Sequence, residues 1–294
     1  SNLAAGTYTI IVKDVNGCTF STSAIIINTS GPTASAVAGT ILCNGGTTSV
    51  TVSATGGTAP YTGTGTFTQS AGTTVYTVTD ANGCIATASV TITQPTLLVP
   101  AETHTVILCN GGTSTVTISA TGGTAPYTGT GTFTQSAGTT SYTVTDANGC
   151  TKPISVTITQ PTLLVPAETH TAILCNGGTS TVTISATGGT APYTGTGTFT
   201  QSAGTTSYTV TDANGCTKSI SVTITQPTAI TAIATSTINA TCGAANGSLT
   251  LGAVTGGTSA YTYSVNASAF TSTLLYSNLA AGTYTIIVKD VNGC

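Results

Sequence analysis

Residues 96–161 read TLLVPAETHTVILCNGGTSTVTISATGGTAPYTGTGTFTQSAGTTSYTVTDANGCTKPISVTITQP, and the same stretch recurs at residues 162–227. The two copies differ at two positions only, where Val106 becomes Ala172 and Pro153 becomes Ser219. A near-verbatim repeat with a fixed period of 66 residues indicates an array of small modules. An array of near-copies adds length, whereas an enzyme needs one site that differs from its surroundings. The repeat therefore favours a structural protein.

The module recurs on both sides of these two copies. Each further copy keeps a glycine-rich motif, GGTAPY or GGTSAY, and an Asp-x-Asn-Gly-Cys motif near its end. The predicted domains are complete repeats at 30–95, 96–161 and 162–227, a repeat lacking its last strand at 228–294, and the C-terminal part of a truncated repeat at 1–29.

The two ends of the chain share a sequence. Ser1–Cys18 is identical to Ser277–Cys294, and Thr19–Asn28 reads as the strand that the last repeat lacks. We interpret the chain as a window on a longer tandem protein. The alternative is a polymer of short chains, in which the first segment completes the last domain of a neighbouring copy by strand addition.

Every repeat reads as short strands with a period of two. Val50, Val52 and Ala54 alternate with hydroxyl residues, and no segment shows the 3.6-residue apolar period of a helix. Glycines and the Asp-Ala-Asn-Gly sequence supply turns between the strands. About seven short strands in so small a module predict two packed antiparallel sheets. The predicted fold class is all-β, a rod-like tandem array of small antiparallel immunoglobulin-like β-sandwich domains.

The alternation also predicts which side chains are buried. For repeat 30–95 the expected core is Leu42, Val50, Val52, Tyr61, Phe67, Tyr76, Val78, Val90 and Ile92. One tyrosine recurs at the start of the penultimate strand, where immunoglobulin-like sandwiches use a tyrosine to bond backbone across a corner. The predicted structural tyrosines are Tyr8, Tyr76, Tyr142, Tyr208 and Tyr284. The alternative role for these rings is a platform on which sugars stack.

Charge is sparse, with four lysines, no arginine and seven acidic residues in the 294 residues. A nucleic-acid-binding protein needs a basic footprint, and none is present. No apolar run reaches about 18 residues, so we expect no direct membrane insertion. The composition thus excludes nucleic acid and the bilayer core as partners.

The nine cysteines fall in register and predict disulfides formed in an oxidising compartment. The candidates are Cys43, Cys84, Cys109, Cys150, Cys175, Cys216, Cys242 and Cys294, with Cys18 left over. A bond within each repeat, such as Cys43–Cys84, is the simplest expectation. Those two cysteines can lie at opposite ends of a sandwich, however, so links between neighbouring repeats, such as Cys43–Cys150 or Cys84–Cys109, stay open.

No catalytic or cofactor-binding set accompanies the cysteines. Each repeat has two of them, and His104 and His170 are single, so neither a zinc site nor an activated thiol is expected. Asp80-Ala-Asn82-Gly83 resembles the start of a calcium loop but lacks the distal ligands, which favours an aspartate-stabilised turn. A calcium ion between modules, held by Glu102 or Glu168, is the alternative. We expect no enzyme, no cofactor and no metal.

The combination of motifs resembles a known family. A Cys-x-Gly sequence precedes a Thr/Val strand, followed by GGT-x-PY, L-x-AGTYT-x-x-V-x-D-x-NGC and SVTITQP. This order is similar to the SprB repeat of cell-surface adhesins in gliding Bacteroidetes, and residues 242–294 fit best. The three middle repeats depart from it, because YTGTGTFTQSAGTTVY replaces the usual middle strand. The resemblance implies an extracellular β-sandwich repeat, type IX secretion, and a role in surface adhesion and gliding motility.

The sequence therefore predicts a structural shaft or stalk segment of a large exported cell-surface adhesin or filament. Its expected location is extracellular, at a bacterial cell surface, and its expected partners are neighbouring repeats or copies of the same protein. Two alternatives remain. One is a module that binds surface glycans or solid substrata through Thr and Tyr side chains, and the other is a strand-swapped homopolymeric filament subunit.

Overall fold

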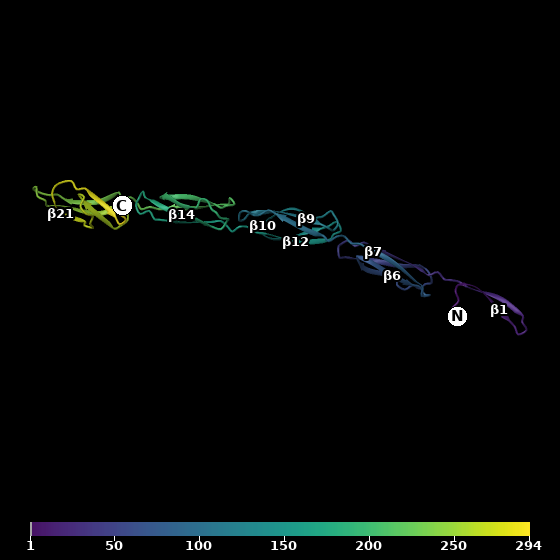
Figure 1. The fold of residues 1–294 in the computed structure, drawn as a ribbon. Helices are drawn as coiled ribbons and strands as arrows, with labels where there is room; N and C mark the ends of the chain where they lie inside the picture. The colour runs from purple at the N-terminus through teal and green to yellow at the C-terminus, as the bar shows by residue number, and fades with distance from the viewer. Residues whose placement is uncertain (1) are drawn as a thin grey trace. The chain divides into compact units, whose positions relative to one another are not determined.

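A computed structural model describes residues 2–294, and the described residues form strands and no helix (Figure 1). The chain divides into two compact units. One contains the residues up to Thr105 together with Thr115–Gln135 and Thr139–Thr157, and the other contains Val106–Ser114, Ser136–Gly138 and Ile158–Cys294. The fold class predicted from the sequence, all-β with small antiparallel immunoglobulin-like sandwiches, is confirmed.

Repeat 30–95 is a sandwich of two sheets. Its strands are β3 (Pro32–Ala38), β4 (Thr47–Gly56), β5 (Gly65–Ser70), β6 (Gly72–Thr79) and β7 (Ile85–Ile92). One sheet has the order β3-β4-β5, and the second pairs β6 with β7, which lie side by side in Figure 1. In both sheets the strands are antiparallel, so alternate residues face the space between the sheets.

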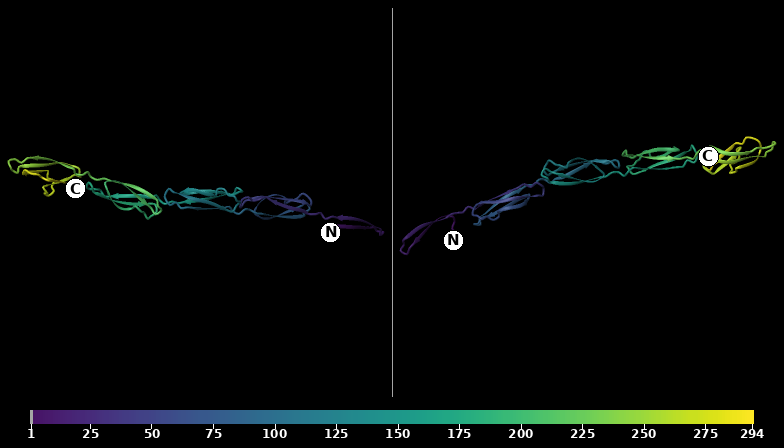
Figure 2. Two further views of the ribbon diagram at one scale, coloured as in Figure 1. Left: turned by 90° about the horizontal axis from the view of Figure 1, so that it is seen from above. Right: turned by 180° about the vertical axis from the view of Figure 1, so that it is seen from behind.

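The next two repeats follow the same plan. Repeat 96–161 has β8 (Val99–His104), β9 (Thr113–Thr121), β10 (Gly131–Ser136), β11 (Gly138–Thr145) and β12 (Thr151–Ile158). Repeat 162–227 has β13 (Val165–His170), β14 (Thr179–Thr187), β15 (Gly197–Ser202), β16 (Gly204–Thr211) and β17 (Thr217–Ile224). Each has one three-stranded and one two-stranded sheet, and Figure 2 shows these groups of strands from two further sides.

Each complete repeat has five strands, so the expectation of about seven is wrong. The Thr-Gly-Thr-Gly segment forms no strand before Gly65, where β5 begins, and Gly63 within it has a φ of 85°. Side-chain-free residues at positive φ interrupt an extended ladder. Before β5 begins, an isolated bridge joins Thr62 to Thr79.

The core of repeat 30–95 follows most of the predicted pattern. The buried cluster consists of Ile41, Val50, Val52, Tyr76, Val78 and Ile92, with Tyr61 and Val90 half-buried beside it. Two predicted core residues do not belong to it, because Leu42 is 55% exposed and Phe67 is 36% exposed. Ile41, which is 5% exposed, takes the expected place of Leu42 in the core.

Repeat 228–294 and the first segment differ from this plan. The repeat has β18 (Ala232–Ile238), β19 (Gly247–Thr255), β20 (Tyr261–Val265), β21 (Leu275–Leu279) and β22 (Ile286–Asp290), in sheets of order β18-β19-β21 and β20-β22. The first segment is a two-stranded hairpin of β1 (Gly6–Lys13) and β2 (Thr19–Ile26). Both hairpin strands are exposed along almost their whole length.

Candidate functional site

Three disulfides join a cysteine of one repeat to a cysteine of the next. The bonds and their Cα–Cα distances are Cys43–Cys150 (5.6 Å), Cys109–Cys216 (5.7 Å) and Cys175–Cys294 (5.6 Å). The expectation of a bond within each repeat is therefore wrong, and the link between neighbours, Cys43 to Cys150, is the one that forms. Cys84 and Cys242, two of the candidates, are free thiols, as is Cys18.

The two cysteines of a repeat cannot meet because they lie at its opposite ends. The Cys43 loop is held to the end of its own repeat, where Asn44 Nδ2 donates to the Pro95 carbonyl (2.9 Å) and the Gly45 N–H to Gln94 Oε1 (2.7 Å). Cys84 instead lies at the beginning of the repeat, beside Gly31. A Cβ added to Gly31 would lie 3.5 Å from the Cβ of Cys84. A strand-length separation exceeds the Cα distance that a disulfide spans.

The same cysteine loop is held in the next two repeats. Asn110 donates to Pro161 (3.0 Å) and Asn176 to Pro227 (3.0 Å), while the following glycine N–H bonds Gln160 or Gln226 (2.7 and 2.8 Å). The Cys-Asn-Gly sequence and the Gln-Pro that ends each repeat thus act together. Their recurrence is visible in the sequence, but their contact is not.

An asparagine beside each second cysteine adds a hydrogen bond across the junction. Asn148 Nδ2 donates to the Leu42 carbonyl (3.0 Å), and the Cys150 sulfur lies 3.4 Å from that oxygen. Equivalent contacts join Asn214 to the Leu108 carbonyl (3.0 Å) and Asn292 to the Leu174 carbonyl (3.2 Å). The exposed leucine thus contributes its backbone to the joint, a role that hydrophobic periodicity does not reveal.

A buried aspartate shapes the turn that presents the asparagine and cysteine. Asp212 Oδ1 accepts from the N–H of Asn214 and Cys216, both at 2.9 Å, and Oδ2 accepts from the N–H of Thr190 (3.0 Å). Burial raises the pKa of Asp212, but these N–H donors outweigh it, and the pKa is lowered from 3.8. The carboxylate oxygens are used by the turn itself, as the interpretation of Asp80 as a turn residue predicts.

The hydroxyls of the recurrent tyrosines are placed in three different ways. Tyr8 and Tyr284 donate to backbone carbonyls four residues upstream, Ala4 (2.6 Å) and Ala280 (2.9 Å). Tyr142 and Tyr208 donate to the side-chain oxygens of Gln135 (3.1 Å) and Gln201 (3.0 Å). The hydroxyl of Tyr76 is buried and has no hydrogen-bond partner among residues 2–294.

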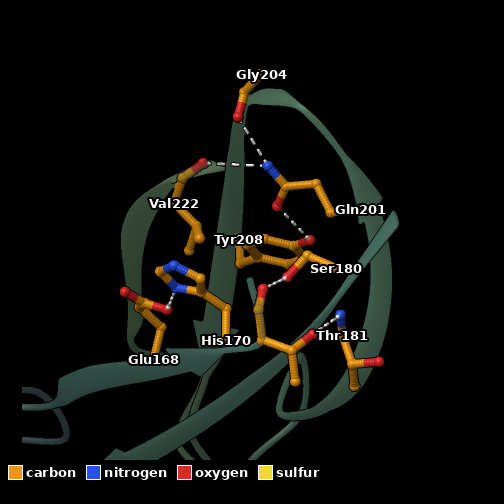
Figure 3. A network of polar contacts seen from close by, with 9 residues as sticks. Glu168, His170, Ser180, Thr181, Gln201, Gly204, Tyr208 and Val222 are labelled. Atoms are coloured by element: carbon orange, nitrogen blue, oxygen red, sulfur yellow. Dashed lines mark hydrogen bonds and ion pairs between the residues drawn. The ribbon is translucent and has the colours of Figure 1, made fainter. Parts of the chain in front are cut away.

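Figure 3 shows how the glutamine completes the network in repeat 162–227. Gln201 Nε2 donates to the carbonyls of Gly204 (3.0 Å) and Val222 (3.3 Å), while its Oε1 accepts from Tyr208. The glutamine therefore ties the three-stranded sheet to both strands of the second sheet. This role of Gln201 was not predicted, and its burial at 6% exposure is the signal that identifies it.

The aromatic residues of repeat 30–95 do not form an exposed platform. Tyr76 is 8% exposed and packs on Phe67, with ring centroids 5.1 Å apart. Tyr61 is half-buried, and its hydroxyl donates to the Gly56 carbonyl (2.5 Å). Binding of glycans by each repeat stays a prediction. The burial of Tyr76 and the backbone contact of Tyr61 do not favour it.

The acidic residues considered as metal ligands are engaged locally. His104 and His170 each face a glutamate, with 2.9 Å between Nδ1 and the Oε2 of Glu102 or Glu168, and the second pair is drawn in Figure 3. Within residues 2–294, no three His, Cys, Asp or Glu side chains gather where they could hold a metal ion. The described part of the chain also contains no helix able to span a membrane.

Comparison with solved structures gives a weak likeness to the N-terminal eight Ig domains of Down Syndrome Cell Adhesion Molecule isoform 1.30.30. The TM-score is 0.28 at 10% identity, covering 88% of this chain and 56% of that one. A likeness this weak carries no argument about function, and the chain spans little more than half the length of that structure. A comparison with curated proteins finds no match.

The comparison with family models matches part of the last repeat. The matching family is described as the SprB repeat, and the matched residues are 234–270, which include most of β18 and all of β19 and β20. The resemblance to the SprB repeat read from the sequence motifs is therefore confirmed within repeat 228–294.

Proposed function

We propose that this chain is a structural shaft or stalk segment of an exported cell-surface adhesin or filament, and that it carries tension. The observation that carries the proposal is the staggering of the disulfides, each of which closes the joint between two repeats. Bonds placed within repeats would protect single modules. Bonds placed between repeats instead connect one module to the next outside the main chain.

The staggered bonds create a short covalent path through the array. Cys43 and Cys294 are 251 residues apart along the chain. Through two disulfides the path follows the main chain only from Cys150 to Cys175, which are 25 residues apart. At 3.3–3.6 Å per residue, the fully extended lengths are about 80–90 Å for the short path and about 830–900 Å for the chain.

Much of this short path is already extended in the folded protein. It contains β12 and β13, which are strands, and strands rise by about 3.3 Å per residue. Pulling on the ends therefore gains little length even if the repeats unfold. This property suits a shaft, which has to transmit force without lengthening.

The finer parts of the proposal rest on the SprB resemblance. They are extracellular location at a bacterial surface, export by the type IX route, and a part in surface adhesion and gliding. Three disulfides are typical of proteins that mature in an oxidising compartment, which supports export. We assign the shaft no catalytic role, and we place recognition of the adhesion target outside the repeats.

Single-molecule force spectroscopy of the full chain, pulled from its two termini, tests the proposal. Reduction should add about 750–800 Å of contour length between Cys43 and Cys294, because 226 more residues enter the path. The oxidised chain should show no such gain. If the oxidised chain lengthens as much as the reduced one, the proposal is wrong.

Two double variants form a matched pair for this experiment. Cys43→Ser with Cys150→Ser lengthens the shortest path to 107 residues, through the two remaining bonds. Cys109→Ser with Cys216→Ser leaves the 25-residue path intact, since that path does not use the middle bond. The first variant should gain length under force and the second should behave as the parent.

A further inference from the structure

Each joint between complete repeats is a short stretch of main chain outside the strands. The first joint, residues 93–98, lies between β7 and β8, and the second joint, residues 159–164, lies between β12 and β13. Leu97 and Leu163 in these joints are 55% and 56% exposed. Exposed segments outside regular structure are preferred sites of proteolytic cutting. Each joint is therefore a place where a protease can reach the main chain between two modules.

The composition already removes most cutting sites for one class of endopeptidase. The chain has no arginine and four lysines, and Lys152 is the one lysine between Lys13 and Lys218. Lys152 is followed by Pro153, and enzymes that cut after basic residues do not cut a bond whose nitrogen belongs to a proline ring. An endopeptidase that selects apolar residues, in contrast, finds an exposed leucine in each joint.

The staggered disulfides span both joints. The bond Cys43–Cys150 crosses the first joint, and the bond Cys109–Cys216 crosses the second. A cut between Thr96 and Leu97 therefore leaves the two cysteines of the first bond on different pieces, which that bond still connects. Bonds within repeats would give no such connection, because both cysteines of a pair would lie on the same piece.

The connection extends to every peptide bond between Cys43 and Cys294. The three disulfides span residues 43–150, 109–216 and 175–294. Each span overlaps the next, so no single cut in this range separates the chain into two molecules. One cut in each of the first two joints also leaves the pieces connected, because the middle piece keeps one cysteine of each spanning bond.

The chain ends that a cut in the first joint creates are already anchored. On one side the Pro95 carbonyl accepts a hydrogen bond from Asn44 Nδ2 (2.9 Å), and on the other side Leu98 is buried at 5% exposure. The hydrogen bond from Asn148 Nδ2 to the Leu42 carbonyl (3.0 Å) joins the two repeats without using the cut segment. Cleavage therefore loosens the short stretch between these anchors and leaves the other contacts of the joint in place.

We propose that the staggered disulfides are a second covalent connection through each joint, which keeps the shaft in one piece after an extracellular endopeptidase with apolar selectivity has cut its main chain. Hydrolysis breaks the peptide C–N bond, and water supplies an oxygen to the new carboxylate and two hydrogens to the new ammonium group. The disulfides take no part in this reaction. The extracellular setting rests on the proposed function, whereas the second connection rests on the bonds themselves.

The second connection gives the middle disulfide a role that tension alone does not. The short path from Cys150 to Cys175 runs through the second joint and does not use the bond Cys109–Cys216. Once the second joint is cut, the path runs from Cys150 back to Cys109, crosses the middle bond, and runs from Cys216 back to Cys175. Each of these two stretches joins cysteines that are 41 residues apart. The middle bond thus protects the segment that carries the load.

Cleavage at one defined bond tests the proposal. The recognition sequence of a site-specific endopeptidase is inserted between Thr96 and Leu97 in one variant of the full chain and between Thr162 and Leu163 in another. Free thiols are blocked with N-ethylmaleimide, and digestion continues until a reducing gel shows no uncut chain. Without reductant, each cut protein should give one full-length band on a denaturing gel. Two separate fragments without reductant would overturn the proposal.

The two disulfide double variants provide matched controls. With Cys43→Ser and Cys150→Ser, the cut in the first joint should separate the chain, while the cut in the second joint should not. With Cys109→Ser and Cys216→Ser, the two outcomes should be exchanged. Separation that does not follow the missing bond in this way would contradict the assignment of each bond to its joint.

Force spectroscopy of the cut chains distinguishes this inference from the shaft proposal. A cut in the first joint should leave the oxidised chain as short as the uncut one, because the short path does not use that joint. A cut in the second joint should add about 190–205 Å, since the path grows from 25 to 82 residues. Rupture of that chain instead would overturn the inference. An uncut oxidised chain that lengthens would contradict the shaft proposal alone, because the gel assay applies no force.

Discussion

Cys43 is bonded to Cys150 of the following repeat, with Cα atoms 5.6 Å apart at a sequence separation of 107. Cys84, the partner expected within the same repeat, is a free thiol at that repeat's other end. The cysteines therefore hold neighbouring modules together, and this relationship gives the first prediction.

Non-reducing peptide mapping of the purified chain should recover three linked peptides, Cys43–Cys150, Cys109–Cys216 and Cys175–Cys294. In the chain-entropy description a bond closing about 100 residues stabilises by about 4.7 kcal/mol. Reduction should thus lower resistance to urea while leaving the far-UV circular dichroism of the repeats in place without denaturant. Recovery of a Cys43–Cys84 peptide would contradict the structure.

Removal of a tyrosine hydroxyl should have opposite consequences in two repeats. Tyr208→Phe leaves the buried Gln201 oxygen without its donor and should cost about 1–3 kcal/mol. Tyr76→Phe removes a buried hydroxyl that has no partner among residues 2–294, so it should be neutral or stabilising. Hydrogen exchange of the amides in β16 and β6 reports each repeat separately. An equal loss at both sites would show that the hydroxyls are equivalent.

Acid should weaken the repeats through their turn aspartates. Because the folded-state pKa of Asp212 lies below 3.8, ionised Asp212 stabilises the fold above the unfolded-state pKa, and this contribution is lost as pH falls through the folded-state pKa. The pKa values of Asp80, Asp146 and Asp290 are lowered in the same direction. Circular dichroism across an acid titration should therefore show loss of stability below about pH 4.

The matched variants for this prediction are Asp212→Asn and Asp14→Asn. Asp212 is 5% exposed and accepts three N–H groups, so the asparagine amide would face a donor and destabilise repeat 162–227. Asp14 makes a similar turn in the exposed hairpin, outside any core. The prediction fails if Asp14→Asn lowers the stability of that repeat as much as Asp212→Asn does.

Alanine should be tolerated differently at two glycines of the same repeat. Gly177 has φ +79°, and a Cβ added there would meet open space, so Gly177→Ala should cost about 1–2 kcal/mol for the left-handed backbone alone. Gly188 has φ +70°, and an added Cβ would lie 1.9 Å from the Leu163 carbonyl oxygen. Gly188→Ala should therefore cost clearly more by urea denaturation, and equal costs would argue against this close approach.

The sequence predicted the buried residues of the sheets better than it predicted where the strands end and how many there are. Alternation placed Val50, Val52, Val78 and Ile92 correctly in the core. It placed Leu42 there too, because periodicity cannot locate the residue at which a chain leaves the strand direction. The count of strands was too high for a similar reason, since Thr62 and Thr64 suit a strand while Gly63 between them has a positive φ that interrupts one.

The sequence by itself determined that this protein is a tandem array of small β-sandwich modules with turn aspartates and paired cysteines, because period, alternation and turn motifs are local properties of a chain. Only the tertiary structure decided which cysteines meet and which carbonyls Asn148 and its equivalents bind. These depend on where the ends of each strand lie in space. The two cysteines of one repeat sit at opposite ends of the same sandwich, so each finds its partner in a neighbour.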